Sequence, residues 1–299
     1  GRGEIPLKFA YLGKGALNWN TIAETRSEKG GINSTEGDLL LKKSKIFLDS
    51  IGTPSSINII DIGCGNGFPA FPLLEELERR NISFKYVPID ISQDLLDLAQ
   101  KNILDRFPNV EVEKNLLDFE LGNFSDITYR LKENGSTNLL LFLGSTLGNH
   151  SDRTRVLTNF RDSMTAEDFL IIGVEATNLS QINKILSHYR GKAIDDFVYF
   201  IPEQIGLRRK DTEPIVTWND ALSQVEVRIR LKQDREITIG NDSFTLEKDE
   251  DILLGRSVKF TESTITNIFS DINFRNEILT TNPNRTYVLA MVQPTRYST

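Results

Sequence analysis

Three alternate glycines follow an apolar run and form the strongest chemical signal in the sequence. The stretch from 59 to 67 reads IIDIGCGNG, with glycines at Gly63, Gly65 and Gly67. Glycines let a backbone turn sharply and approach a ligand closely, because no Cβ stands in the way. The pattern therefore predicts a ligand-binding loop at the carboxyl end of a strand.

The glycines by themselves fit two kinds of ligand. Read from Gly65, the stretch matches Gly-x-Gly-x-x-Ala through Ala70, a variant of the dinucleotide-binding pattern. Read from Asp61, it resembles the D/E-x-G-x-G-x-G opening of class I methyltransferases, in which a carboxylate faces the positively charged methionine end of S-adenosylmethionine (SAM). Asp61 favours the second interpretation, because a carboxylate there would repel a dinucleotide pyrophosphate.

Further acidic positions follow at the expected distances. Asp90 ends the next apolar run, where a carboxylate can accept hydrogen bonds from the ribose hydroxyls of an adenosyl group. Asp118 and Phe119 come after the third run, where methyltransferases place an Asp near the adenine amino group and an apolar residue on the ring face. Any one of these residues alone is more simply a solvated loop residue. In this order and spacing they predict SAM as the cofactor.

A second stretch brings a family resemblance. Residues 142–149 read FLGSTLGN and resemble the F-L-G-S-T-I-G-N motif of the histidine-specific methyltransferases, a family with members on the ergothioneine pathway and a dimethylallyltryptophan N-methyltransferase. The resemblance continues through DFE at 118–120, WNDA at 218–221 and SVKF at 257–260, and so covers nearly the whole chain. It implies a SAM-dependent methyltransferase with an amino-acid-like acceptor.

The resemblance also implies roles for single residues. Asn149 matches the residue that grips the amino and carboxylate groups of the acceptor, Tyr11 one that lines the pocket, and Ser257 one that contacts the side-chain end of the acceptor. We assign Gly144 to the cofactor site. His150 is a candidate general base because histidine titrates near neutral pH, although a polar residue at a helix start is the simpler interpretation.

Two departures from the family motif concern the acceptor. Gly255 and Arg256 stand where the histidine enzymes carry Glu and Ile, so the carboxylate that would hold an imidazole is missing. Residues 30–35 read GGINST where those enzymes carry a Tyr pair. We therefore expect N-methylation of an amino-acid-derived small molecule other than histidine. Two alternatives stay open: O-methylation of a carboxylate or hydroxyl of a small molecule or peptide, since Gly255 opens space and Arg256 can attract a carboxylate, and a non-catalytic SAM-binding module.

The hydrophobic pattern indicates how these residues are positioned. Apolar runs alternate with amphipathic segments, which predicts an α/β fold built from parallel βαβ units. We expect a Rossmann-like class I methyltransferase core over residues 51–180, a helical N-terminal cover over 1–50, an inserted β-rich substrate domain over 181–260, and a return to the core sheet over 261–299. The expected strands are 57–62, 85–89, 110–112, 139–143, 169–174, 225–231, 236–239, 243–246 and 287–292. The expected helices include 71–81, 92–107, one capped by Ser151, and 261–270. The site should lie at the carboxyl ends of the parallel strands.

Composition narrows the classes of function. Of 299 residues, 39% are hydrophobic and 26% charged, a balance typical of globular proteins. The net charge of -7 disfavours nucleic acid as a partner. No apolar run approaches the ~20 residues of a membrane span, and Cys64 as the single cysteine favours a cytoplasmic location. Two histidines and one cysteine predict no metal site. A start at Gly1 without Met suggests a part of a longer polypeptide.

Overall fold

The computed structural model describes residues 3–28, 32–52, 54–132, 135–177 and 179–295. Two compact units make up the chain. The core unit comprises residues 23–177 and 260–299, and the β-rich unit comprises residues 1–22 and 178–259. The chain therefore leaves the core unit once and returns to it near its C-terminal end.

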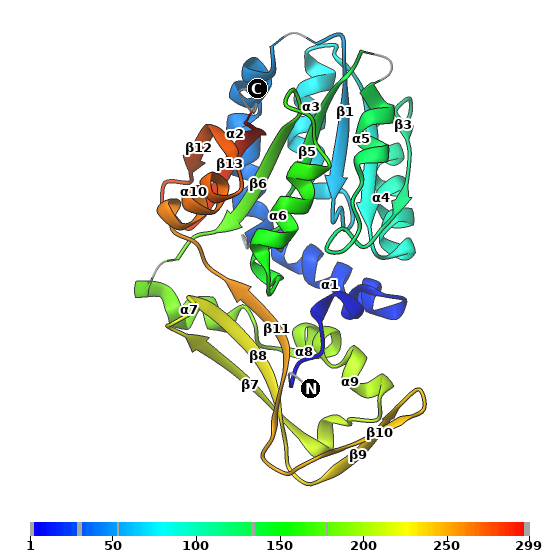
Figure 1. Cartoon of the computed structure of the whole chain (residues 1–299), viewed down its shortest axis with the longest axis vertical. Coiled ribbons are helices and arrows are strands. Elements are labelled where there is room, and N and C mark those ends of the chain that lie inside the picture. The colour runs from blue at the N-terminus through cyan, green and yellow to red at the C-terminus, as the bar shows by residue number, and fades with distance from the viewer. Residues whose placement is uncertain (1–2, 29–31, 53, 133–134, 178, 296–299) are drawn as a thin grey trace. The chain divides into compact units, whose positions relative to one another are not determined.

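The core unit is built on an eight-stranded mixed sheet with the order β12-β13-β6-β5-β1-β2-β3, in which β4 also pairs with β2 (Figure 1). Pairing is parallel from β6 through β5, β1 and β2 to β3 and β4, and antiparallel for β13 with β6 and for β12 with β13. The strands are β1 (Ser56–Ile62), β2 (Ser83–Asp90), β3 (Glu111–Val112), β4 (Asn115–Leu116), β5 (Thr137–Phe142), β6 (Phe169–Glu175), β12 (Phe274–Thr281) and β13 (Tyr287–Pro294).

Helices cover this sheet, and its central strands are buried along almost their whole length. β6 is buried at every residue, and β1 and β5 at every residue but the first. The helices are α2 (Ile32–Ile51), α3 (Phe71–Arg79), α4 (Gln93–Arg106), α5 (Ser125–Lys132), α6 (Arg153–Asp162) and α10 (Glu262–Asp271), with the 3-10 turns η2 (Phe68–Ala70) and η3 (Thr146–Asn149). One apolar cluster joins α2, α3 and α4 to the central strands. The predicted α/β, Rossmann-like core is confirmed.

The β-rich unit has a separate apolar core. Its three-stranded antiparallel sheet has the order β11-β8-β7, and β9 and β10 form a hairpin. Its elements are η1 (Leu7–Tyr11), η4 (Leu179–Gln181), α7 (Ile182–Ser187), α8 (Lys192–Val198), α9 (Phe200–Gln204), η5 (Arg209–Asp211), β7 (Thr212–Asn219), β8 (Gln224–Leu231), β9 (Arg235–Ile239), β10 (Asp242–Leu246) and β11 (Asp251–Val258). Helix α1 (Lys14–Glu28) begins in this unit and continues past the unit boundary at residue 22.

Several elements differ from the sequence-based expectations. Residues 1–50 do not form one cover, since the segment up to Ile22 clusters with the β-rich unit and α2 with the core unit. β7, β11, β12 and α5 were not expected. In β12 only Phe274 is buried; the other positions are exposed or half-buried and several are polar, which hides the strand pattern. The predicted Ser151 cap is wrong: the Asp152 carboxylate accepts the hydrogen bond from Arg155 N at 2.9 Å, because α6 begins only at Arg153.

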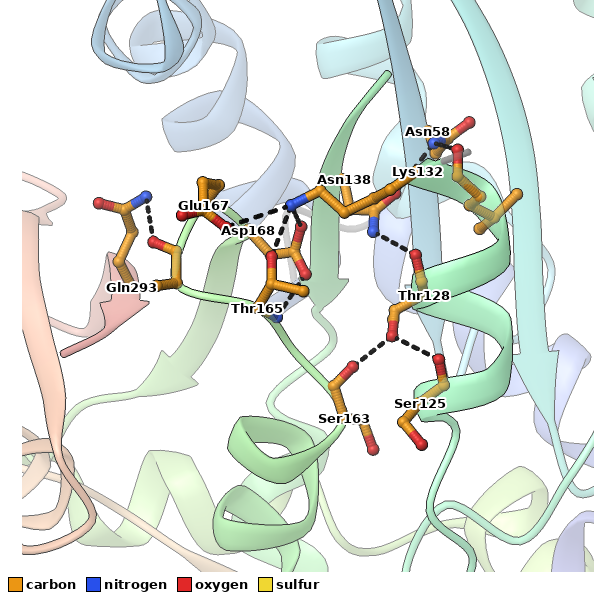
Figure 2. Close-up of polar contacts among 12 residues, drawn as sticks. Asn58, Ser125, Thr128, Lys132, Asn138, Ser163, Thr165, Glu167, Asp168 and Gln293 are labelled. Atoms are coloured by element: carbon orange, nitrogen blue, oxygen red, sulfur yellow. Dashed lines mark hydrogen bonds and ion pairs between the residues drawn. The ribbon is translucent and has the colours of Figure 1, made fainter. Parts of the chain in front are cut away.

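Buried amides tie α5 to the sheet at the amino ends of the parallel strands (Figure 2). Asn138 on β5 is fully buried, donates to the carbonyl oxygen of Thr128 at 2.9 Å, and accepts from Asn58 Nδ2 at 2.9 Å. Asn58 on β1 also donates to the carbonyl oxygen of Leu131 at 3.1 Å. Beside them, Lys132 Nζ lies 2.8 Å from the buried carboxylate of Asp168. The hydrogen bonds of the two amides satisfy polar groups that are buried.

We expect Asn138→Leu to lower the free energy of unfolding by about 2–4 kcal/mol, because it removes the side-chain partner of one Asn58 N–H and of the Thr128 carbonyl, at ~1–3 kcal/mol each, while Asn58 keeps its bond to Leu131. Urea unfolding followed by circular dichroism measures this. The double variant Asn58→Leu/Asn138→Leu should lose less than the sum of the single variants, since both interacting amides are then removed together. If the losses of the two single variants added up to the loss of the double variant, the two amides would not be coupled.

Candidate functional site

The glycine loop has the backbone that the sequence predicts. Gly63, Gly65 and Gly67 follow β1 with φ of 64°, 55° and 79°, values in the left-handed region that favour glycine. A Cβ on Gly63 would lie 3.4 Å from the Phe119 ring, and one on Gly67 would lie 3.5 Å from Cα of Ala99 on α4. These are ordinary contact distances, so the loop needs glycine for its left-handed backbone and not for lack of space.

Asp61, at the end of β1, is buried between strands. Only 3% of its surface is exposed, and the hydroxyl of Tyr86 on β2 donates to Oδ2 at 2.5 Å. Burial raises the pKa of Asp61 to about 7, and the negative charge of Asp90 adds to the shift, while the Tyr86 hydrogen bond opposes it. Asp61 is thus a carboxylate whose ionised form a nearby cation would stabilise.

Asp90 links the first two strand ends. Its Oδ2 accepts from the backbone N–H of Gly65 at 3.3 Å and its Oδ1 from that of Ser92 at 3.0 Å. Burial raises its pKa to about 6. The Cys64 thiol also lies within hydrogen-bond distance of Oδ2, at 4.0 Å. The geometry fits the predicted ribose contact.

Phe119 packs in an aromatic cluster beside the loop. Its ring lies edge-on to Phe142, His150 and Phe160, with centroids 5.6, 5.7 and 5.9 Å away. Asp118, just before it, accepts from Glu120 N at 3.1 Å. His150 Nδ1 lies 3.7 Å from Glu120 Oε1, and among the described residues its buried Nε2 has no hydrogen-bond partner. His150 is therefore packed among rings next to the predicted adenine contact.

The loop after β5 carries the predicted acceptor contact. Gly144 and Ser145 both adopt left-handed backbone, with φ of 73° and 59°, and η3 then ends at Asn149. Asn149 is half-buried, and within the described ranges its side-chain amide makes no hydrogen bond. It does not cap α6, because Asp152 has that role. The amide is thus available to a ligand.

Glu36 is a residue of this region that sequence reasoning missed. It lies on α2 with 1% exposure, and both of its carboxylate oxygens accept from Gly144 N, at 3.0 and 2.9 Å. The signal in the sequence was an acidic residue one turn before the apolar pair Leu39 and Leu40, which places a charge on a core-facing helix surface. Burial raises its pKa to about 7, against the hydrogen bonds from Tyr287 and Gly144.

The raised pKa values of Glu36, Asp61 and Asp90 predict how stability depends on pH. The folded protein binds protons at these groups more tightly than the unfolded chain, so their contribution to stability is full below their ordinary pKa of about 4 and is lost as pH rises through about 6–7. We expect the Tm of the ligand-free protein to fall between about pH 5 and about pH 7, the range between the ordinary and the raised pKa values, and to level off above it. Thermal scans measure this.

The matched control is Asp61→Asn. This variant removes one of the three titrating carboxyl groups, so the Tm should fall less with rising pH. Carboxylates with lowered pKa, such as Glu76 and Glu113 at about 2, titrate outside this range. Cationic SAM should raise the Tm more at the higher pH, since it favours the ionised carboxylates. A Tm that rises with pH over this range would contradict the assignment.

The remaining predicted site residues lie in the β-rich unit. The Tyr11 ring packs edge-on against Phe197, with centroids 5.2 Å apart. Ser257 on β11 is 4% exposed, and its hydroxyl accepts from Lys259 Nζ at 2.8 Å. Lys259 Nζ also donates to the Tyr189 hydroxyl at 2.7 Å. Ser257 is therefore held by a buried cation.

Gly255 and Arg256 occupy an irregular part of β11. The pairing of β11 with β8 shifts between Leu253 and Gly255. Arg256 lies 2.6 Å from Glu4 Oε2, with 13% of its side chain exposed. Arg256 is therefore already paired with a carboxylate, and its attraction of a substrate carboxylate stays a prediction. Residues 30 and 31 and the side chains of 32–34, where the family's Tyr pair is replaced, lie outside the described residues.

Neither a membrane helix nor a metal cluster occurs in the described ranges. None of their helices is long and apolar enough to cross a bilayer, and no three His, Cys, Asp or Glu side chains gather as metal ligands.

The strand order and the glycine loop define a class I, SAM-dependent methyltransferase fold. Magnesium protoporphyrin IX methyltransferase from Synechocystis shares this fold, with a TM-score of 0.52 at 12% identity over 96% of this chain and 98% of that one. A SAM-dependent methyltransferase from Clostridium acetobutylicum aligns with a TM-score of 0.48 at 10% identity, over 93% and 99% of the two chains.

The family follows from the sequence comparison. The model of the histidine-specific, SAM-dependent methyltransferases matches residues 2–294, and the chain belongs to this family, whose cofactor is SAM. Ergothioneine biosynthesis protein 1 of Neurospora crassa is 28% identical over 182 residues, which are 58% of this chain and 19% of that protein. The chain thus spans about a fifth of the length of this curated relative.

Proposed function

We propose that this chain transfers the methyl group of SAM to the amino nitrogen of an amino-acid-derived small molecule. The observation that carries the proposal is Asn149, whose amide is unpaired among the described residues at the carboxyl end of β5, in the motif that the family uses to hold an amino acid. The relative's part in ergothioneine biosynthesis supports an acceptor that resembles an amino acid.

The cofactor residues have separate proposed roles. When bound, SAM supplies an electrophilic methyl carbon on a positively charged sulfur. Asp61 faces the cationic methionine end, Asp90 accepts from the ribose hydroxyls, and the loop of Gly63, Gly65 and Gly67 lets the backbone approach. Three more residues complete this cofactor set: Asp118, Phe119 and Gly144. The pKa values of Asp61 and Asp90 suit this role, since a cation would shift both groups toward the ionised form.

The proposed reaction is a single in-line displacement. The acceptor nitrogen uses its lone pair to form the new N–C bond, the S–C bond breaks, and the sulfur leaves as a neutral thioether. The amine proton then passes to water or to a base such as His150. Asn149 orients the nitrogen, because its amide offers both a donor and an acceptor. Such orientation contributes ~7 kcal/mol or more to lowering the barrier.

On the acceptor side, the family resemblance assigns acceptor contacts to Tyr11 and Ser257, and Gly255 leaves room where the histidine enzymes carry Glu. We infer a small molecule rather than nucleic acid, because the net charge is -7. A cytoplasmic location is proposed from the single cysteine.

The experiment is incubation with isotope-labelled SAM and a panel of amino acids, tryptophan derivatives and short peptides, followed by mass spectrometry. An N-methylated product supports the proposal. An ester or ether product supports O-methylation instead, a methylated peptide extends the acceptor class, and SAM binding without any product supports a binding module. Asp90→Ala is the control, because losing charged hydrogen bonds of ~1.5–3 kcal/mol each should weaken SAM binding and abolish labelling together.

A further inference from the structure

Glu36 is a buried carboxyl to which the proposed reaction gives no role. It lies on α2 and is 1% exposed, and Leu39 and Leu40, one turn further along the helix, are buried beside it. Glutamate is almost never fully buried unless partners satisfy it. Its partners therefore indicate what it does.

These partners join two distant segments to one loop. The backbone N–H of Gly144 donates to Oε1 at 3.0 Å and to Oε2 at 2.9 Å, and the hydroxyl of Tyr287 on β13 donates to Oε1. Gly144 begins the loop that runs to Asn149. Glu36 thus fixes the start of the loop that carries the proposed acceptor contact.

The sheet leaves room for this carboxyl at one glycine. A Cβ on Gly173, in the middle of β6, would lie 2.1 Å from Glu36 Oε1 and 2.7 Å from the Tyr287 hydroxyl. Glycine in a strand interior weakens the strand and marks a close approach. Any larger residue at Gly173 would displace the carboxyl, so the position of Glu36 is set by the sheet as well as by the helix.

The loop needs such an anchor because its backbone is strained. Ser145 has a φ of 59°, which a non-glycine residue keeps only where its surroundings hold it. Its Oγ accepts from Glu175 N at 2.6 Å, and Thr146 Oγ1 donates to the Leu143 carbonyl at 2.8 Å. With Gly144 held by Glu36, each of the first three loop residues has a fixed partner.

We propose that Glu36 is a positioning residue, whose carboxylate holds the Gly144 N–H and thereby sets the loop that places Asn149 against the methyl acceptor. The inference rests on the proposed function, in which Asn149 orients the acceptor. A carboxylate suits the task because it accepts from both Gly144 and Tyr287 and offers no donor of its own.

Protonation of Glu36 would introduce a competing donor at this position. Burial raises its pKa to about 7. The ionisable groups around it are Tyr287 on β13, Asp61 at the end of β1 and Glu175 at the end of β6, and none of them is a cation. We therefore expect the acidic limb of the kcat profile to follow the ionisation of Glu36.

The test is Glu36→Gln, with Asp38→Asn as the matched control, since Asp38 is an exposed carboxylate on the same helix. Gln has the same shape, but it presents an N–H to Gly144 or Tyr287. We expect hydrogen–deuterium exchange of residues 142–150 to rise by about 10-fold. We also expect kcat to fall by about 100-fold, because the reacting atoms are misplaced, with SAM affinity by calorimetry unchanged.

Normal exchange and normal kcat in Glu36→Gln, with only a lower Tm, would overturn the proposal, as would an equal loss of SAM affinity. If the wild-type protein methylates no acceptor, the proposed function fails, and unaltered exchange in Glu36→Gln would separately refute the anchoring.

If Glu36→Gln does not fold, Tyr287→Phe replaces it. This variant keeps the Gly144 bonds but loses a hydrogen bond that lowers the pKa of Glu36, so the acidic limb of kcat should move to higher pH. An unmoved limb would refute the role.

Discussion

Asn149→Ala should lower kcat/KM for the methyl acceptor by about 100-fold, because a displacement of about 1 Å in the reacting atoms costs that much. The expectation rests on the position of Asn149 at the end of η3, where among the described residues its amide has no hydrogen-bond partner. SAM affinity should stay near the wild-type value, since Asn149 is assigned to the acceptor and not to the cofactor. Steady-state kinetics and calorimetry measure the two quantities separately.

An Asn just before a helix can instead act as its N-cap, and this is the competing role for Asn149. A lost cap would lower stability by ~1 kcal/mol and leave turnover intact. In the structure Asp152 caps α6, since its carboxylate accepts a hydrogen bond from Arg155 N at 2.9 Å. Asp152→Ala is therefore the matched control: it should lower the Tm and keep kcat. A normal kcat/KM in Asn149→Ala would refute the assignment to the acceptor.

Free histidine should be a poor substrate. Its kcat/KM should be lower than that of the preferred acceptor by up to ~10⁴-fold, because the site lacks a polar group that matches the imidazole. Gly255 stands where the family's histidine enzymes carry the imidazole-holding Glu. Competition between histidine and the acceptor found in the panel gives the ratio. Efficient methylation of histidine would show that another group binds the imidazole.

Gly255→Glu should increase kcat/KM for histidine by at least ~10-fold. A tenfold change corresponds to about 1.4 kcal/mol of added binding free energy. The site can accommodate a side chain: a Cβ on Gly255 would meet only the Leu7 methyls, at the ordinary contact distances of 3.6 and 3.8 Å. Gly255→Gln is the matched control, with the same shape and no charge. Equal gains in both variants would mean that the carboxylate is not what histidine needs.

Sequence patterns predicted the core of this protein because its signals are local. The buried strands β1, β5 and β6 are short apolar runs, and a glycine loop needs glycine at its own positions. The order of Asp61, Asp90 and Asp118 after successive strands likewise follows from parallel topology, in which strand ends share one edge. Fold class and cofactor therefore followed from residues near one another in the chain.

Tertiary structure decided what depends on residues far apart. Glu36 accepts a hydrogen bond from Tyr287, which is 251 positions away in the sequence. No local sequence pattern predicts such a pair. Arg256 likewise pairs with Glu4, 2.6 Å away and near the other end of the sequence. Edge strand β12 mixes polar and apolar residues, since only part of it is buried. The sequence by itself determined the α/β core, through the periodicity of its apolar residues, and the SAM loop, through the conformations that glycine allows. The partners of the buried charges were decided only by the tertiary structure, because burial and distance set the energies of those charges.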